Sequence, residues 1–453
     1  MYNDLIHAPF GSEIKENSMD EKQRKRAIWA WTMYDWGNSA FATTIMAAVL
    51  PVYYSSVAAA SLAPAQATAN WGFTTSIAAF LAAVLSPILG AIADFQGSKK
   101  RFLFIFMLLG VIATGLLYFV TEGKWPLASA LYIFANIGFA GSLVFYDGLL
   151  PHVASGDEID AVSSRGYAMG YIGGGLLLLI NVVMILFGPS LFPNMDPTLM
   201  SRLSFITVSL WWLVFSIPIL RYVNEPVRRV LKSEIGRNPI AVSFSRLATT
   251  FKEIRNYRDL FMFLAAFWVY ANGIGTIIVM ATIYGAEIGI GRTTLIGTLL
   301  MVQFVAAPFA IGFGWLAKRI GTKKAIYLSL GVYTIIAIIG YFMTQEWHFW
   351  ALGAAVATVQ GGSQALSRSL IGRMMPKSKS AEFFGFFSVS EKFSSIAGPF
   401  LFGVVSTIMG NSRLSILSLI VFFVAGTFLL TKVNVERGIA QAEQDEKNLV
   451  TAS

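Results

Sequence analysis

The 453-residue sequence has no cysteine and only three histidines. Without cysteine the chain has no disulfide, no thiol nucleophile and no cysteine ligand for a metal. His7, His152 and His348 fall in a polar terminal segment, a loop and the far end of a predicted helix, so we do not expect them to form the clustered set that a catalytic or metal site needs. There is also no G-x-x-x-x-G-K-(S/T) loop that would bind ATP. We therefore expect no cofactor, no metal site and no ATP-driven activity.

Charged residues are scarce too, at 13% of the chain, whereas a soluble protein uses about a quarter. Apolar residues make up 55%, and the mean hydropathy is +0.63. Apolar runs of about 20 residues recur, which is the length that a helix needs to cross ~30 Å of hydrocarbon. The sequence predicts an all-α polytopic membrane protein with twelve transmembrane helices, at residues 27–57, 70–94, 101–121, 125–150, 164–188, 200–222, 258–286, 291–317, 323–343, 347–372, 381–408 and 412–432.

These spans divide the chain into two bundles of six helices. The N-terminal bundle covers residues 27–222 and the C-terminal bundle covers residues 258–432. A basic linker at 223–257 joins them, and polar tails lie at 1–26 and 433–453. Because a polar terminal segment has little to pack against, we expect the C-terminal tail to fray.

The net charge of +9 has two interpretations. It would suit nucleic-acid binding, but the basic residues are spread through short loops, which favours a positive-inside membrane topology. With twelve spans and an internal N-terminus, the outer loops hold only Lys124, Arg202, Arg292 and Arg413. We therefore predict that both termini are cytoplasmic, in a plasma or inner membrane.

Two segments between apolar runs resemble each other at an offset of 224 residues. They are Gly90-Ala-Ile-Ala-Asp94-Phe-Gln-Gly97-Ser-Lys99-Lys100-Arg101 and Gly314-Trp-Leu-Ala-Lys318-Arg-Ile-Gly321-Thr-Lys323-Lys324. Both resemble the signature loop of the major facilitator superfamily, which joins the second and third helices of each half. The resemblance implies two six-helix repeats with a substrate site between them near mid-membrane.

The same resemblance gives Asp94 a role. This acid would lie near the N-terminal, positive end of the eleventh helix and latch the two halves together in one state. Phe95 stands where the family usually has a basic residue, which would weaken the latch. In the second copy Lys318 replaces the acid, which leaves open whether that loop latches at all.

Three charges lie deep inside apolar spans, where insertion costs about 2.5–3.5 kcal/mol each. Asp35 lies in the first span, and Glu391 and Lys392 lie at similar depth in the eleventh. We hypothesise that Asp35 and Lys392 form an ion pair between the halves when the cytoplasmic side is closed. Alternatively, Lys392 pairs within its own half, or Asp35 is only an interfacial residue. Asp35 and Glu391 are also the deep carboxylates that could carry a proton.

A second cluster is expected at the cytoplasmic ends of the fourth and tenth spans, from Tyr146, Asp147, Arg368 and Arg373. Charges near helix ends can reach water by snorkelling, so an interfacial fringe is an equal interpretation.

Uncharged polar residues at mid-span are the remaining candidates for substrate contact. They can line a cavity for a polar solute, or they can join helices through hydrogen bonds worth about 0.6 kcal/mol each. In the superfamily the first, fourth, seventh and tenth spans line the cavity, which makes cavity lining an equal interpretation for Asn136, Asn272 and Gln360. The candidates are Asn38, Asn136, Asn272, Gln360 and Gln364, with Gln303 a weaker one.

Longer segments narrow the resemblance to the vacuole-effluxer-like branch, whose fungal members export amino acids from the vacuole. They are Tyr34-Asp35-Trp36-Gly37-Asn38-Ser39-Ala40-Phe41, Val162-Ser-Ser-Arg165-Gly166-Tyr167-Ala-Met-Gly170-Tyr-Ile-Gly-Gly-Gly175, Gln360-Gly-Gly-Ser-Gln364-Ala-Leu-Ser-Arg368-Ser and Ala381-Glu382-Phe-Phe-Gly385. Two positions depart from the branch. Asn272 stands where members often carry an acid, and Glu391 stands where a small residue is usual.

The sequence thus favours a monomeric secondary transporter for a small polar solute, which the resemblance makes amino-acid-like. Coupling to protons would use Asp35 or Glu391. The first alternative is a flippase or exporter of lipids or amphipaths with the same fold. A membrane-embedded enzyme is the remote alternative, because clustered nucleophiles, bases and metal ligands are missing from the sequence.

Overall fold

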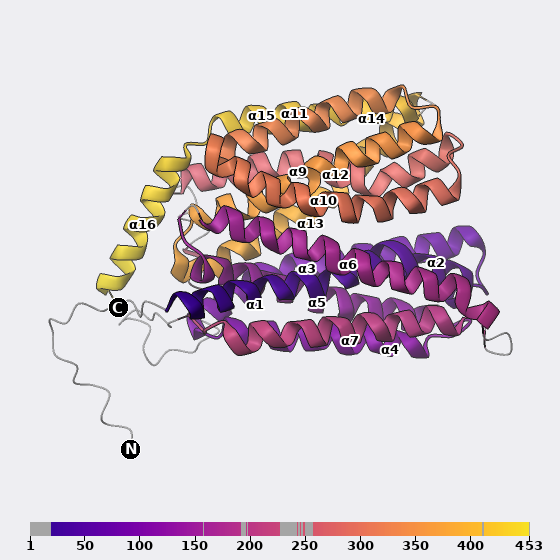
Figure 1. The fold of residues 1–453 in the computed structure, drawn as a ribbon, viewed down its shortest axis with the longest axis horizontal. Helices are drawn as coiled ribbons and strands as arrows, with labels where there is room; N and C mark the ends of the chain where they lie inside the picture. Colours follow the sequence, from indigo (N-terminus) through magenta and orange to yellow (C-terminus); the bar gives the residue numbers. More distant parts are fainter. Residues whose placement is uncertain are drawn as a thin grey trace, which may run out of the picture.

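The computed structural model describes residues 20–156, 158–191, 196, 198–226, 242, 245, 248–249, 257–409 and 412–452. Residues 1–19 of the predicted N-terminal tail and most of the predicted basic linker lie outside this part. Regular structure in the described residues is helical throughout. Figure 1 shows two helical bundles lying side by side with their long helices roughly parallel.

The helices of each half follow the predicted spans closely. In the N-terminal half they are α1 (Glu21–Ala40), η1 (Phe41–Ala48), α2 (Val49–Tyr53), η2 (Tyr54–Ala58), α3 (Pro64–Gln96), α4 (Lys99–Leu116), η3 (Leu117–Phe119), α5 (Trp125–Val153), α6 (Glu158–Leu191) and α7 (Leu199–Tyr222). In the C-terminal half they are α9 (Arg258–Glu287), α10 (Arg292–Ile320), α11 (Thr322–Tyr341), α12 (Glu346–Arg373), η5 (Lys377–Lys379), α13 (Ser380–Met409), α14 (Ser412–Ser418), α15 (Ile420–Thr431) and α16 (Val435–Ala452).

The described helices form the twelve spans of the predicted membrane fold. Helices α1 to η2 run on as one span, and α14 and α15 together make the last one. Ten of the spans are long and apolar enough by composition alone to cross a membrane. The other two are α12 and α13. Helix α12 is rich in small and polar residues because much of it is buried between other helices, where lipid does not set its composition.

The first span contains two π-helical segments, η1 and η2. In η1 the N–H of Val49 donates to the carbonyl of Thr44, five residues back. Pro51 follows and has no N–H to continue an α-helical ladder. Such π segments in membrane helices often coincide with functional regions.

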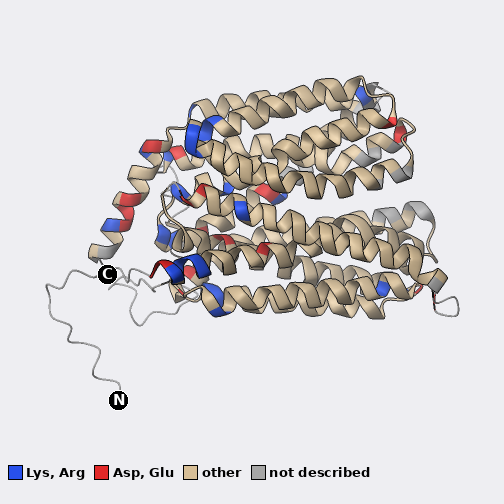
Figure 2. Cartoon of the chain, viewed as in Figure 1, with Lys and Arg blue, Asp and Glu red and all other residues tan. Residues whose placement is uncertain are grey.

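The two signature loops are tight turns at the same end of the molecule. Helix α3 ends at Gly97, whose φ of 60° is left-handed, and helix α10 ends at Gly321, whose φ is 90°. Glycine adopts such angles without the strain that a Cβ atom would bring. We call the end of the bundle that holds Gly97 and Gly321 the loop end. Figure 2 shows Lys and Arg gathered at this end, near both chain termini, and few charges along the long helices.

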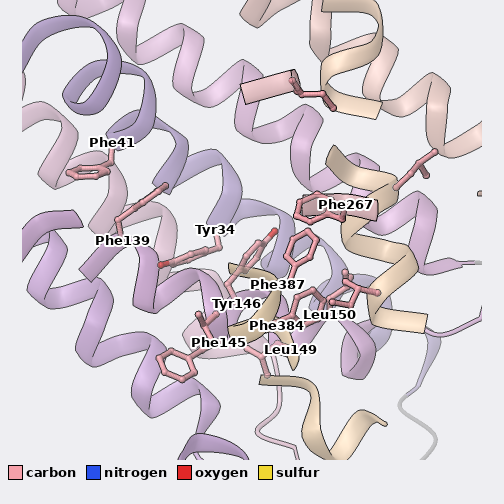
Figure 3. Close-up of a cluster of buried hydrophobic side chains, with 14 of the residues drawn as sticks. Tyr34, Phe41, Phe139, Phe145, Tyr146, Leu149, Leu150, Phe267, Phe384 and Phe387 are labelled. Atoms are coloured by element: carbon pink, nitrogen blue, oxygen red, sulfur yellow. The ribbon is translucent and has the colours of Figure 1, made fainter. Parts of the chain in front are cut away.

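The hydrophobic core runs through both halves. One buried cluster contains Tyr146 and Leu150 of α5 together with Phe384 and Phe387 of α13 (Figure 3). Large apolar side chains such as Leu186, Phe400 and Ile408 are instead exposed on the outside of the helices. A membrane protein presents such a surface to lipid.

The expectation that the C-terminal tail frays is wrong. Residues Val435–Ala452 form helix α16, which lies across the loop end (Figure 1). Arg437 donates to the buried carboxylate of Asp259 at the start of α9, with Nη2 2.9 Å from Oδ1. Ala442, on the inner face of α16, is buried. The tail is ordered because it is amphipathic, a pattern that its low overall hydropathy conceals.

Candidate functional site

Arg368 of α12 joins the two halves near the loop end. Its Nη1 lies 3.3 Å from Oδ2 of Asp35 on α1 and 3.2 Å from Oδ1 of Asp147 on α5. Its Nη2 also lies 3.4 Å from the same oxygen of Asp35. Only 3% of the Arg368 surface is exposed. One buried cation from the C-terminal half is thus shared by two carboxylates of the N-terminal half.

Helix α6 supplies two further acceptors to this arginine. Arg368 Nε donates to Ser163 Oγ at 2.9 Å, and Nη2 donates to the Ser163 carbonyl at 2.9 Å. The guanidinium carbon also lies 4.3 Å from the ring centroid of Tyr167, a distance at which a cation is attracted to the ring face. The arginine is therefore fixed in orientation as well as charge.

Asp35 is held by a second group of its own half. The Tyr146 hydroxyl donates to Asp35 Oδ2 at 2.6 Å. Tyr146 is stacked on Trp31 with ring centroids 4.3 Å apart, and the Trp31 Nε1 donates to the Tyr146 carbonyl at 2.9 Å. A Cβ atom at Gly166 would lie 2.6 Å from Asp35 Oδ2, so glycine there lets α6 approach the carboxylate.

The predicted direct pair between Asp35 and Lys392 is wrong for this structure, because the ion-pair partner of Asp35 is Arg368. Depth along a helix had suggested Lys392, but the direction in which a side chain points is not set by depth. Lys392 and Glu391 interact electrostatically with each other, and Glu391 also interacts with Arg368 and Asp147. We call Asp35, Asp147, Arg368, Glu391 and Lys392 the central charge cluster. It joins the charges of the first expected cluster to Asp147 and Arg368 of the second, whereas Arg373, also expected in the second, pairs with Asp160 instead.

The uncharged candidates divide by what they contact. Gln364 of α12 accepts a hydrogen bond from the Tyr171 hydroxyl of α6 at 3.0 Å, so it bridges the halves. Asn272 lies within the C-terminal half. Its Nδ2 donates to the Trp268 carbonyl at 2.6 Å, and its Oδ1 accepts the Gly398 N–H at 3.0 Å, which joins α9 to α13.

Gln360 and Gln303 line a mostly apolar cavity of about 140 Å³ within the C-terminal half. Asn38 and Asn136 are buried in the N-terminal half at 2% and 4% exposure. The Asn38 Nδ2 and the Asn136 Oδ1 have no hydrogen-bond partner among the described residues. These two amides keep unused hydrogen-bonding capacity in the interior of the first half.

The first signature loop makes the contact that the resemblance implies. The carboxylate of Asp94 accepts the Glu382 N–H of α13 at 2.8 Å and pairs with Lys99 at 2.7 Å. A Cβ atom at Gly90 would collide with the Ala381 carbonyl oxygen, so glycine is needed where α3 crosses α13. The Lys100 N–H, at the start of α4, donates to Glu225 at 2.9 Å. The role of Asp94 as a latch stays a prediction.

The second signature loop packs against α6. A Cβ atom at Gly314 would lie 2.8 Å from the Cβ of Ser164. Lys323 is turned away from the other half, and its Nζ donates to the Val433 carbonyl at 2.6 Å. Sequence reasoning missed the acid at this loop, which comes from α6: Asp160 pairs with Arg373 at 3.3 Å. Asp160 lies in the first turn of a helix, where acidic residues are common, so the sequence does not single it out.

The contacts at Gly90, Gly314, Asp94 and Arg368 show that the halves are closed together at the loop end. A search of the described residues finds no group of three or more His, Asp or Glu side chains that could hold a metal ion. The site is an ionic junction that joins the two bundles at the loop end.

Comparison with known proteins shows which proteins this chain is similar to. The family model described as "Vacuole effluxer Atg22 like" matches residues 63–443. The chain is 41% identical to an uncharacterized MFS-type transporter, YxiO, of Bacillus subtilis, over 92% of this chain and 96% of that one. It is 24% identical to autophagy-related protein 22 of Yarrowia lipolytica, over 82% and 76% of the two chains. The fold is similar to that of the transporter FucP in its outward conformation, with a TM-score of 0.66, 15% identity and coverage of 90% and 98%.

Proposed function

Because this chain belongs to the vacuole effluxer Atg22-like family of major facilitator transporters, we propose that it moves a small amino-acid-like solute by alternating access, coupled to protons. The protein is a multi-pass membrane transporter and not an enzyme. Its substrate and its coupling ion are the proposed parts. The observation that supports them is that Arg368 forms ion pairs with both Asp35 and Asp147.

Alternating access requires the two halves to part at the loop end. Parting there separates Arg368 from Asp35 and Asp147, since the arginine belongs to one half and the acids to the other. These buried ion pairs stabilise the closed junction when every group is charged. Neutralising one of the charges, or giving it another partner, therefore favours opening.

A proton can supply part of that compensation. The central charge cluster holds three acids, Asp35, Asp147 and Glu391, and two bases, Arg368 and Lys392. With every group ionised its net charge is therefore −1. One bound proton makes the cluster neutral. If it binds Asp35 or Asp147, it also removes one of the two carboxylates that pair with Arg368.

A zwitterionic solute fits the remaining requirement. Its carboxylate can take the place of Asp147 on Arg368, and its ammonium group can meet a carboxylate of the cluster that stays ionised. A solute with only one of these groups would leave a buried charge without a partner. This match of both charge signs supports an amino acid or a similar zwitterion as the transported class.

The test is transport of a labelled amino-acid panel in proteoliposomes, with and without an imposed pH gradient. We expect gradient-driven accumulation by the wild type and its loss in Asp35→Asn and Asp147→Asn. Asp196→Asn is the matched control, because Asp196 lies outside the cluster and its ion pair with Arg202 is partly exposed. Accumulation that ignores the gradient would refute proton coupling. Movement of lipids or amphipaths, with no movement of any amino acid, would refute the solute class.

We also propose that the protein works as a monomer with both termini on the cytoplasmic side. The natural absence of cysteine makes the orientation easy to test. Lys124 and Glu443 are exposed at opposite ends of the molecule. In intact cells a membrane-impermeant maleimide should label Lys124→Cys and leave Glu443→Cys unlabelled. The reverse pattern would invert the topology.

A further inference from the structure

Asp160 lies in the first turn of α6 and is only 2% exposed. Its described partners come from the other half of the molecule. Thr322 of α11 donates to Asp160 Oδ2 at 2.7 Å, and Arg373 of α12 lies 3.3 Å from the same oxygen. Ser369 of α12 donates to Oδ1. The carboxylate thus receives hydrogen bonds from two helices across the interface.

We propose that Asp160 is the acid of a second latch between the halves, supplied from the opposite half to the signature loop that lacks one of its own. Thr322 directly follows Gly321 of that loop, where Lys318 stands in the position that Asp94 has in the first copy. The first latch runs from the acid on α3 to the start of α13. The second runs from the acid on α6 to the start of α11 and the end of α12. This inference rests on the proposed alternating access.

The position of Asp160 relative to the central charge cluster supports a role in closure. Ser163, one turn along α6, accepts hydrogen bonds from Arg368, while Asp160 binds Arg373, more than one turn along α12. The same two helices are therefore joined twice, by two arginines that bind neighbouring turns of α6. An acid that served only the packing of its own half would find its partners there.

The two latches lie at different edges of the loop end. The Asp94 latch joins α3 to α13, and the Asp160 latch joins α6 to α11 and α12. Figure 1 shows α6 beside α10, the helix that leads into the second loop. Since the loop end opens only when both edges part, removing Asp160 should raise the fraction of time that the α6 edge is open.

Ser164 provides a reporter for that opening. It is 1% exposed at the contact between α6 and Gly314 of α10, and its hydroxyl has no hydrogen-bond partner among the described residues. Serine and cysteine have similar shapes, and the chain contains no other thiol. The rate at which Ser164→Cys reacts with a small maleimide therefore measures how often α6 and α10 separate.

In this background we expect Asp160→Asn to raise the labelling rate about tenfold, the factor that corresponds to about 1.4 kcal/mol. Asp160→Glu keeps the charge and should restore much of the wild-type rate. Glu158→Gln is the matched control, because Glu158 lies in the same turn but pairs with Arg24 of its own half. An Asp160→Asn rate equal to that of the control would overturn the proposal.

Loss of folding would also expose the thiol, so each variant needs its unfolding temperature measured in detergent. Thr322→Val removes the hydrogen bond to Asp160 and the one that Thr322 accepts from Arg373, and it leaves Asp160 charged and paired with Arg373. It should raise labelling by a smaller factor than Asp160→Asn while the unfolding temperature stays close to that of the wild type. A rate unchanged in a folded Thr322→Val variant would remove α11 from the latch.

The labelling assay uses no solute and no gradient. If the proteoliposome panel shows no amino-acid transport but Asp160→Asn still labels faster, the solute is wrong and the latch stands. If transport is as proposed and labelling is unchanged, the latch fails alone. A faster transport rate in Asp160→Asn at saturating solute, with little change in KM, would identify the latch as limiting the opening step.

Discussion

Replacing Arg368 with glutamine should unlock the loop end. The side chain makes two contacts with Asp35, at 3.3 and 3.4 Å, one with Asp147 at 3.2 Å and two with Ser163 at 2.9 Å each. Glutamine is shorter and neutral, so it cannot reproduce this fork of donors or its charge. The change leaves two carboxylates facing each other without the cation that they share.

The magnitude follows from the burial of those carboxylates. The Asp35 and Asp147 side chains are 10% and 13% exposed, so water screens them little in the closed state. Removing one partner of a buried pair costs about 3–5 kcal/mol. Since every 1.4 kcal/mol is a factor of ten, the closed state should lose more than a hundredfold in population relative to the open state.

The assay is maleimide labelling of Ser164→Cys, combined with thermal unfolding in detergent. Arg368→Gln should label at least a hundredfold faster or unfold at a clearly lower temperature. The variant that adds Asp35→Asn and Asp147→Asn neutralises the acids as well and should recover part of the loss. Arg319→Gln serves as the control, because Arg319 is exposed and its guanidinium lies over the Trp315 ring at 3.9 Å. Wild-type labelling and wild-type unfolding in Arg368→Gln would refute the reasoning.

Two further changes test the packing around the cluster. Gly90→Val should prevent closure of the loop end, because its Cβ atom would collide with the Ala381 carbonyl oxygen. The labelling rate of Ser164→Cys should therefore rise sharply. Gly72→Val is the control and should behave as wild type, because there is open space around Gly72. Tyr146→Phe removes the 2.6 Å hydrogen bond to Asp35, which is worth about 1.5–3 kcal/mol when it reaches a charged group. Because both residues belong to the N-terminal half and stay together when the halves part, we expect a lower unfolding temperature with labelling close to that of the wild type. A wild-type unfolding temperature would show that the hydroxyl adds nothing to stability.

The fold follows from the sequence because it depends on patterns that survive without tertiary detail. Apolar runs locate the spans to within a few residues, and Gly97 and Gly321 mark turns whose left-handed backbone angles favour glycine. The end of the chain was misjudged, since α16 has few apolar residues. Its apolar face, which includes Ala442, is buried only when the helix packs across the loop end.

The site could be predicted in part. A charge deep in an apolar span is costly wherever the helix points, so Asp35 stood out from the sequence alone. Its partner did not, because rise along a helix gives depth while tilt and rotation decide which side chains meet. Arg368 and Asp160 are near helix ends, where a sequence reader expects snorkelling. Both are buried only because the opposite half covers them.

The π-helical stretch in the first span changes how variants of that helix should be designed. A turn closed between residues five apart holds one residue more than an α-helical turn, so the angular position of each following residue shifts. A helical wheel drawn through Asp35 would therefore assign residues beyond Phe41–Ala48 to the wrong side. The face that meets α6 continues from Ser39 to Thr43, whose hydroxyl donates to the Gly174 carbonyl at 3.0 Å. Beyond Thr43, the side of the helix on which each residue lies has to be taken from the structure.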